Sequence, residues 1–239
     1  MAVSYMDFTS PNAQFSFDIN RNTTVQKDQR NFINELSIHQ LNTLGNISML
    51  DTYLDKGNVI EMHIHQNASE LVYCISGEVV VSIINPFTKE LRHYPNRPGQ
   101  ATSIPQGWWH YDTATMDGTH FLAIFDQPIP EIIPASDMLR LTPPEAFAHA
   151  YCLDANKVRE AFAPLNQTVI IGPPRGCHQE NQQAPYPNPQ QQQQAYSPHA
   201  SHPPYNQGYG LRPYQQSDGN PRRPQVIGNG WAHLYHDGP

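Results

Sequence analysis

Between residues 47 and 125 the chain consists of short runs of aliphatic, aromatic and β-branched residues, most of which alternate with polar positions as strands with one buried face do. Glycine, proline, asparagine and aspartate separate the runs, and no helical period lies between them. Such closely spaced strands predict an all-β sandwich or barrel rather than a parallel α/β sheet. Eight runs fit this description: 47–54, 59–65, 71–76, 78–84, 90–94, 101–105, 108–114 and 119–125.

The flanking segments have different patterns. Residues 1–45 are polar and mixed, with one short strand predicted at 15–19, and we expect them to form an arm that packs on the main domain. After a proline-spaced loop, two short helices are predicted. Thr142 and Glu145 form a capping box that opens a helix to residue 151, and Asp154 caps a second helix over 155–163 that Pro164 ends.

The last segment, 173–239, holds 12 of the 23 prolines and a run of five glutamines, and it contains no phenylalanine. A segment of this composition cannot bury enough apolar surface to offset the entropy of ordering the chain, so it is predicted to be a disordered tail. Tyrosine, glutamine and proline spaced along it favour either weak multivalent contacts or a plain solubilising function. The predicted organisation is therefore an arm (1–45), a barrel (46–135), a helical extension (136–172) and the tail.

Charge and hydropathy narrow the range of partners. The formal net charge is −7 and no basic stripe is present, which argues against nucleic acid as a partner. No stretch is long and apolar enough to span a bilayer, and the first residues lack a basic patch followed by an apolar run. We expect a cytoplasmic protein without a membrane partner.

Three histidines and one glutamate are placed where a small barrel could bring them to one metal ion. His63 and His65 are two residues apart on a predicted strand, so they point to the same face. Glu70 begins the next strand and His110 comes from a later one. Three imidazoles and one carboxylate leave two of six positions open on Mn(II) or Fe(II). Zn(II), which usually takes four ligands, fits less well.

These residues sit in a pattern that resembles the paired motifs of the cupin family. Gly57, His63, His65, Glu70 and Gly77 match the first motif in spacing, and the second is matched at Gly99, Pro105, Gly107 and His110. The resemblance implies a double-stranded β-helix, or jelly-roll barrel, with the metal bound by the histidines and the glutamate. Residues 15–172 are similar to the single-domain oxalate decarboxylase and germin-like group, which implies homo-oligomers packed through the C-terminal helices.

The departures from that group bear on the substrate. Its oxalate-handling members carry an arginine three residues before the first metal histidine, and here Ile60 occupies that position. They also need a glutamate on a lid, where only Glu131 is present. An isoleucine cannot neutralise a buried dianion, so oxalate is not the expected substrate. The pattern favours a Mn- or Fe-dependent decarboxylase or dioxygenase acting on a small oxygenated or carboxylate molecule.

Alternatives remain open at this point. Glu61 shares the inward parity of His63 and is a candidate acid-base residue, or else a solvated group at the strand entrance. Trp108 and Trp109 flank His110 as a substrate wall or as core packing. The tail resembles those of Bacillus-type spore coat proteins. A second hypothesis is therefore a non-catalytic, oligomeric spore coat protein that keeps the metal site and binds other coat-like proteins through the tail.

Overall fold

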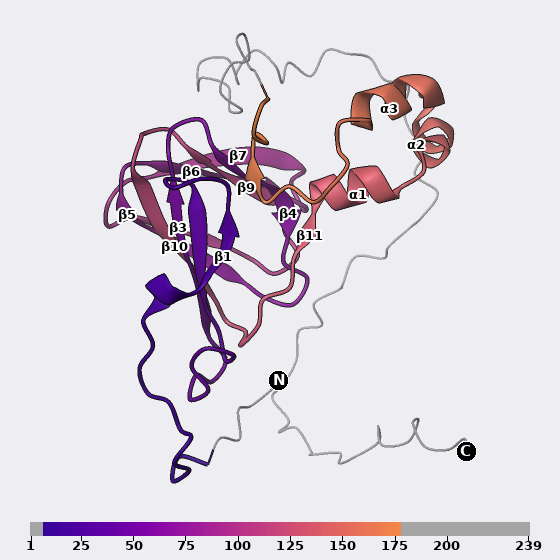
Figure 1. Cartoon of the computed structure of the whole chain (residues 1–239). Helices are drawn as coiled ribbons and strands as arrows, with labels where there is room; N and C mark the ends of the chain where they lie inside the picture. The colour runs from indigo at the N-terminus through magenta and orange to yellow at the C-terminus, as the bar shows by residue number, and fades with distance from the viewer. Residues whose placement is uncertain (1–6, 178–239) are drawn as a thin grey trace, which may run out of the picture. The chain divides into compact units, whose positions relative to one another are not determined.

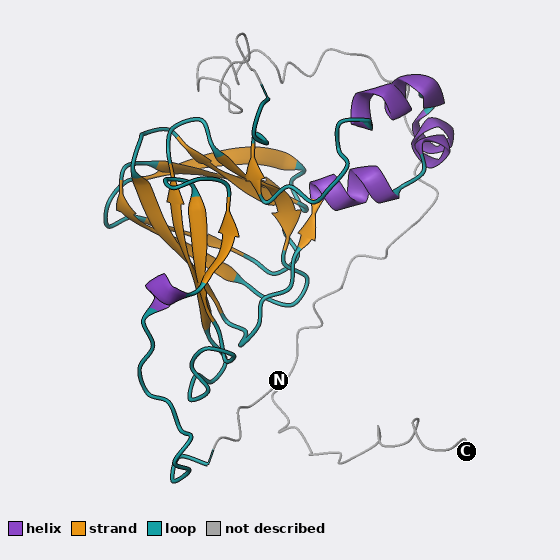
Figure 2. Ribbon diagram, viewed as in Figure 1, coloured by secondary structure: helices purple, strands orange, loops and turns teal. Residues whose placement is uncertain are grey.

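Two antiparallel sheets face each other and enclose the core of the protein (Figures 1 and 2). The computed structural model describes residues 7–177. One sheet has the strand order β1 (Thr23–Gln26), β2 (Phe32–Leu36), β3 (Ser48–Leu54), β10 (Thr119–Phe125), β5 (Glu70–Ser76) and β8 (Ala101–Ile104). The other has the order β11 (Ile133–Pro134), β4 (Val59–Ile64), β9 (His110–Ala114), β6 (Val79–Asn85) and β7 (Glu90–Asn96), with β12 (Ile171–Gly172) also paired to β4.

The core lies between the sheets and follows from the alternation of the sequence. Every second residue of β10 is buried, and Phe121 and Phe125 point inward with 1% of their surface exposed. Leu54, Val72 and Ile104, from β3, β5 and β8, join Phe121 in the main core cluster, and Phe125 packs with Ala68 and Ala123 in a second one. Burying one such side chain contributes about 1.5–3 kcal/mol, so these strands are held mainly by the apolar face they share.

The eight predicted strands are confirmed as β3 to β10, and the all-β jelly-roll class is correct. The strand predicted at residues 15–19 is wrong. Phe15 is 69% exposed, and the Asp18 side chain accepts a hydrogen bond from the backbone N–H of Asn20 and opens a 3₁₀ turn, η1 (Ile19–Arg21). The unpredicted strands β1 and β2 follow it and extend the sheet through β3, so that sheet begins within the segment expected to be an arm.

Three short helices follow the barrel instead of the two predicted: α1 (Ala135–Leu141), α2 (Pro144–Tyr151) and α3 (Ala155–Phe162). The helix α1 was missed because Pro134 precedes it and gives it no side-chain cap. The capping box at Thr142 is also wrong, since Thr142 ends α1 and Pro143 precedes α2 without a side-chain bond. The cap of α3 is confirmed, because the Asp154 carboxylate accepts from two backbone N–H groups.

Within residues 7–177 no helix is long and apolar enough to cross a membrane. The predicted adhesive tail lies outside the described residues from position 178 onward.

Candidate metal centre

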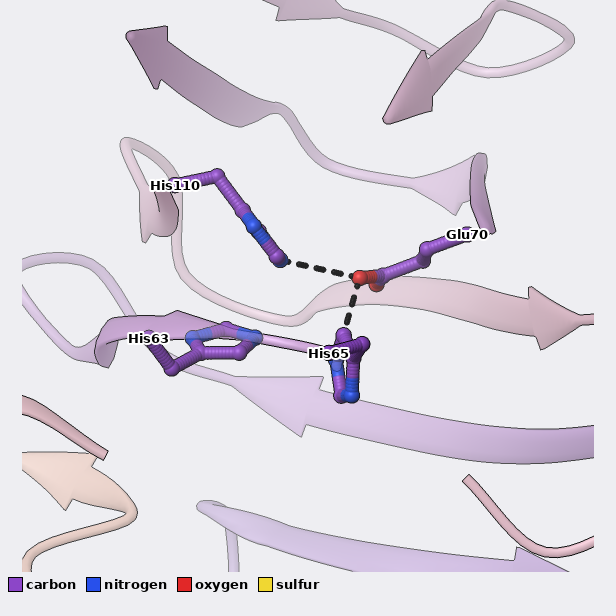
Figure 3. A group of neighbouring side chains, drawn as sticks. All are labelled: His63, His65, Glu70 and His110. Atoms are coloured by element: carbon purple, nitrogen blue, oxygen red, sulfur yellow. Dashed lines mark hydrogen bonds and ion pairs between the residues drawn. The ribbon is translucent and has the colours of Figure 1, made fainter. Parts of the chain in front are cut away.

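Strand ends at one end of the barrel bring four side chains together (Figure 3). His63 is near the end of β4 and His65 directly follows that strand, whereas Glu70 and His110 are the first residues of β5 and β9. His63 and His110 are paired across β4 and β9. The ligand atoms of the four residues all lie within 4.8 Å of one another, and each residue is buried.

Each histidine ring is oriented by a backbone carbonyl. The Nδ1 atom of His63 lies 2.6 Å from the Glu61 carbonyl oxygen, and the Nδ1 atom of His110 lies 2.8 Å from that of Trp108. Likewise, 2.8 Å separates the Nδ1 atom of His65 from the Glu131 carbonyl oxygen. When Nδ1 donates to a carbonyl, the neutral ring carries its free lone pair on Nε2, and this is how metal-binding histidines are commonly fixed. All three rings can therefore offer Nε2 to an ion.

Glu70 is the electrostatic centre of the group. Its Oε2 atom lies 3.0 Å from Nε2 of His110 and 3.3 Å from Nε2 of His65. Burial would raise the pKa of the Glu70 carboxyl, but the hydrogen bonds and charges of the two histidines outweigh burial and hold that pKa well below its usual range. Burial would lower the pKa of His110, yet Glu70 raises it to about 9. Without a metal, a proton on Nε2 of His110 thus occupies the direction that an ion would take.

The fourth member, His63, stays neutral. Burial lowers its pKa well below the ordinary value, and the neighbouring charges of His110 and His65 add to that effect. A neutral buried imidazole with a free lone pair is a ready nitrogen ligand. Three nitrogens and one carboxylate oxygen suit a divalent ion that prefers six ligands, because two positions stay open for water or substrate. The donor set therefore fits a divalent metal ion, and the identity of that ion, Mn(II) or Fe(II), stays a prediction.

The loop between β10 and β11 orients His65, a function that the sequence did not indicate. Besides its carbonyl contact to His65, Glu131 donates its backbone N–H to Oδ1 of Asn67, and its carboxylate accepts from the side chain of Gln66. Asn67 also donates to the carbonyl oxygen of Ile129. The segment that matches the lid of the oxalate-handling relatives in position is thus bound to the β4–β5 turn. Every residue type has a backbone carbonyl, so the contact between Glu131 and His65 could be identified only from the fold.

An irregularity in β4 separates Glu61 from the ligands. Ile60 pairs with Asp112 and His63 pairs with His110, so three residue steps along β4 are matched by two residue steps along β9. This β-bulge places Ile60 on the same face as His63 and breaks the simple alternation. The inward parity predicted for Glu61 is therefore wrong. Its carboxylate accepts hydrogen bonds from the backbone N–H and the hydroxyl of Ser136 at the start of α1, at 3.0 and 2.7 Å.

The catalytic role suggested for Glu61 stays a prediction. Burial raises the pKa of its carboxyl, the two bonds from Ser136 partly offset this, and Asp137 raises it further. The Ser136 hydroxyl also accepts from the backbone N–H of Val169. These contacts give Glu61 a structural function, since it joins β4 to the first helix and to the segment that returns as β12.

Asp112 is a buried acid that sequence reasoning missed. It lies two residues beyond His110 on β9, is 2% exposed, and its Oδ1 atom has no hydrogen-bond partner among the described residues. Burial, reinforced by the charge of Glu70, raises its pKa to about 7, with His110 acting in the opposite direction. The spacing His-x-Asp on a strand was the available signal, because both side chains then face the interior.

Among the glycines of the two motifs, Gly77 is required for a steric reason. Its φ is +71°, and a Cβ atom there would lie 2.7 Å from the Cα atom of Thr119. Only glycine tolerates both the left-handed backbone and this close approach. In the second motif, Gly107 also has a positive φ of 78° and donates its N–H to the His65 carbonyl oxygen at 2.9 Å, which ties the two motifs together.

The fold and the ligand group define a small jelly-roll protein with a site that could bind a metal ion. A family model described as Cupin matches residues 8–159, and the chain therefore belongs to the cupin family. The chain is similar to two curated rice (Oryza sativa subsp. japonica) proteins. It is 27% identical over 124 residues to Germin-like protein 3-7 and 31% identical over 127 residues to Germin-like protein 1-2.

The likeness covers only part of each protein. The two matches take in 50% and 49% of this chain and 52% and 54% of the relatives, so the chain spans about half the length of the curated relatives it matches. Among solved structures, oxalate decarboxylase from Bacillus subtilis superposes with a TM-score of 0.58 at 21% identity, over 67% of this chain and 43% of that one. Procruciferin, an 11S globulin from Brassica napus, gives 0.59 at 22%, over 66% and 42%. At these identities the superpositions show the fold.

Proposed function

We propose that this protein is a Mn(II)- or Fe(II)-dependent enzyme that acts on a small oxygenated or carboxylate substrate, as a decarboxylase or dioxygenase. The convergence of three histidines, each oriented by a backbone carbonyl, with the buried Glu70 carboxylate supports this most directly. When bound, the ion would supply a Lewis acid with open positions. The resemblance to germin-like proteins and oxalate decarboxylase agrees with such chemistry.

The residues around the centre support a substrate other than oxalate. Ile60, which the bulge turns inward, is 8% exposed and belongs to the hydrophobic core. The buried Asp112 lies opposite Ile60 on the neighbouring strand β9, so this wall offers an aliphatic side chain and an acid but no cation. The second carboxylate of a dianion, placed against this wall, would lose its hydration without a cation beside it. A monocarboxylate or a neutral oxygenated molecule suits this wall better.

Metal content of the purified full-length chain tests the proposal. We expect about one equivalent of Mn or Fe per chain by mass spectrometry, and loss of most of it in His63→Ala and His110→Ala. His120→Ala is the matched control, because His120 pairs with Asp51 on the sheet that does not contain His63 and His110, and it is not in the ligand group. A screen over small carboxylates and diketones follows. No bound metal in the wild type, or equal loss in the control, would contradict the proposal.

A second candidate function is a non-catalytic assembly protein that keeps the metal site for stability. The outer face of β5 supports it, since Leu71, Tyr73 and Ile75 are 41%, 39% and 40% exposed in a row. Apolar side chains aligned on one sheet face are typical of a covered surface. Light scattering tests this: the wild type should be an oligomer and Tyr73→Lys a smaller species, whereas a monomeric wild type would exclude assembly through this face. The proposed spore coat role depends on the tail.

A further inference from the structure

A cleft opens on the side of the barrel where the two sheets end. Here β7 and β8, the edge strands of the two sheets, lie opposite each other and enclose a cavity of about 360 Å³. This volume is within the range of small-molecule sites. The lining side chains combine a cation, hydroxyls and rings; they include Ile83, Arg92, Tyr94, Thr102, Ser103 and Trp108.

Arg92 gives the cleft a positive charge. It pairs with Ile83 across β6 and β7, and Ile83 belongs to the core, so Arg92 extends from the inner face of the sheet at its edge. The guanidinium forms an ion pair with Glu90, but the two side chains are 61% and 52% exposed. An exposed pair of this kind contributes little, so the guanidinium can exchange this partner for a ligand carboxylate at small cost.

One aromatic ring that lines the cleft, Trp108, and a second one beside Trp108, Phe87, favour a flat apolar group on that ligand. Trp108 lines the cleft and packs against the core, and the ring of Phe87 lies with its centroid 6.1 Å from that of Trp108. Phe87 is 85% exposed in the turn between β6 and β7, where a large apolar side chain gains nothing from packing. A ring seated beside Trp108 would remove apolar surface of both residues from water.

The cleft is adjacent to the candidate metal centre on the side of His110. Ile83 pairs with His110 across β6 and β9, and the Trp108 carbonyl oxygen accepts from the His110 ring. A second cavity, of about 320 Å³, adjoins Glu70, but its wall contains Asp126 and no cation. Of the two, only the cleft at Arg92 has the charge to hold an anion.

We propose that this cleft binds small aromatic monocarboxylic acids, with the carboxylate on Arg92 and the ring against Trp108 and Phe87. The inference rests on the proposed function, for which it names the substrate class. In this proposal the cation is not at position 60 on β4 but on β7, the edge strand of the same sheet.

Calorimetric titration of the full-length chain with benzoate, and with benzamide as its neutral analogue, tests the proposal. We expect benzoate to bind more tightly than benzamide and Arg92→Gln to weaken benzoate about tenfold while leaving benzamide unchanged. Arg97→Gln is the matched control, because Arg97 is also exposed and paired to one carboxylate, that of Glu78, but lies outside the cleft. Phe87→Ala should weaken both ligands about threefold.

The same titration on His63→Ala separates this inference from the proposed function. Binding of benzoate that persists in His63→Ala and falls in Arg92→Gln supports the cleft, even if no preparation contains metal and the proposed enzyme activity fails. Equal affinities of Arg92→Gln and Arg97→Gln for benzoate would overturn the cleft while leaving a metal-loaded centre intact. Loss of benzoate binding in His63→Ala alone would also overturn it, because the carboxylate would then be on the metal.

Discussion

Replacing Asn67 by alanine should weaken metal binding, although Asn67 is not a ligand. Its side chain donates to the Ile129 carbonyl oxygen at 3.0 Å and accepts from the Glu131 N–H at 2.8 Å. These two bonds hold the loop whose Glu131 carbonyl oxygen contacts Nδ1 of His65. Without them the loop can move away, and the His65 ring loses the partner that fixes its tautomer and direction.

The size of the effect follows from the bonds that are lost and kept. Two solvent-exposed hydrogen bonds contribute about 0.5–1 kcal/mol each, or about 1–2 kcal/mol together. The Gln66 side chain still donates to Glu131, and the Ser48 hydroxyl to the carbonyl oxygen of Gln127, so only part of this free energy reaches His65. We therefore expect the affinity for Mn(II) or Zn(II) to fall by about 3–10-fold.

Competition with a chromogenic chelator measures that affinity, and Asn42→Ala is the control. Asn42 makes the same pair of exposed bonds, donating to the Asn12 carbonyl oxygen and accepting from the Gln14 N–H, each at 2.9 Å. Both substitutions should lower the free energy of unfolding by similar amounts, but only Asn67→Ala should change metal affinity. Unchanged affinity in Asn67→Ala, or the same loss in Asn42→Ala, would refute the proposed orientation of His65 by the loop.

Two further predictions concern stability. Gly77→Ala should lower the free energy of unfolding by denaturant by about 3 kcal/mol or more, because it adds a clash with Thr119 to a left-handed backbone. Gly57→Ala, where φ is +85° and the space is open, should lower it by about 1 kcal/mol. Equal losses in the two variants would exclude the clash. The metal-free protein should lose stability below about pH 4.5 and again above pH 6.5, and Asp112, whose pKa is raised to about 7, adds to the loss as the pH rises toward 7. Glu70, whose pKa is lowered, loses its contribution to the free energy of unfolding as the pH falls below about 4.5. The contribution of the charged His110, at most about 3 kcal/mol, is lost between pH 6.5 and 9. Bound metal should abolish this second loss in thermal melts.

The sequence predicted the barrel strands because they depend on local periodicity, and the ligand group because its members lie at the spacings of two short motifs. Alternation along β10 and the spacing of His63 and His65 are visible in any short window of sequence. The strand β1 (TTVQ) was missed because it is polar, and β2 (FINEL) because it is short and its apolar residues do not alternate; β2 pairs with β3, and β1 pairs with β2. Their partners lie elsewhere in the chain, which no local pattern can reveal.

The residues whose orientation or function was predicted wrongly or missed are those at which the pairing of strands and loops in three dimensions overrides periodicity. Glu61 should face inward by alternation, but the bulge in β4 reverses it, and a bulge depends on the register with β9. The Glu131 carbonyl supports His65 through a contact across 66 residues of sequence. Asp112 could have been found from its spacing to His110, whereas the supporting contacts of the loop could not.

The bulge also explains why the cation in this protein would lie away from β4. It turns Ile60 into the barrel and Glu61 out of it, where Glu61 joins β4 to Ser136 and the first helix. An arginine at position 60 would have to bury its charge within the hydrophobic core, next to the other members of that cluster. At the edge strand β7, by contrast, Arg92 keeps its hydration while its position opposite β8 lets it face the cleft. A cation there costs little desolvation and could hold a monocarboxylate by one end, with the ring of the molecule against Trp108.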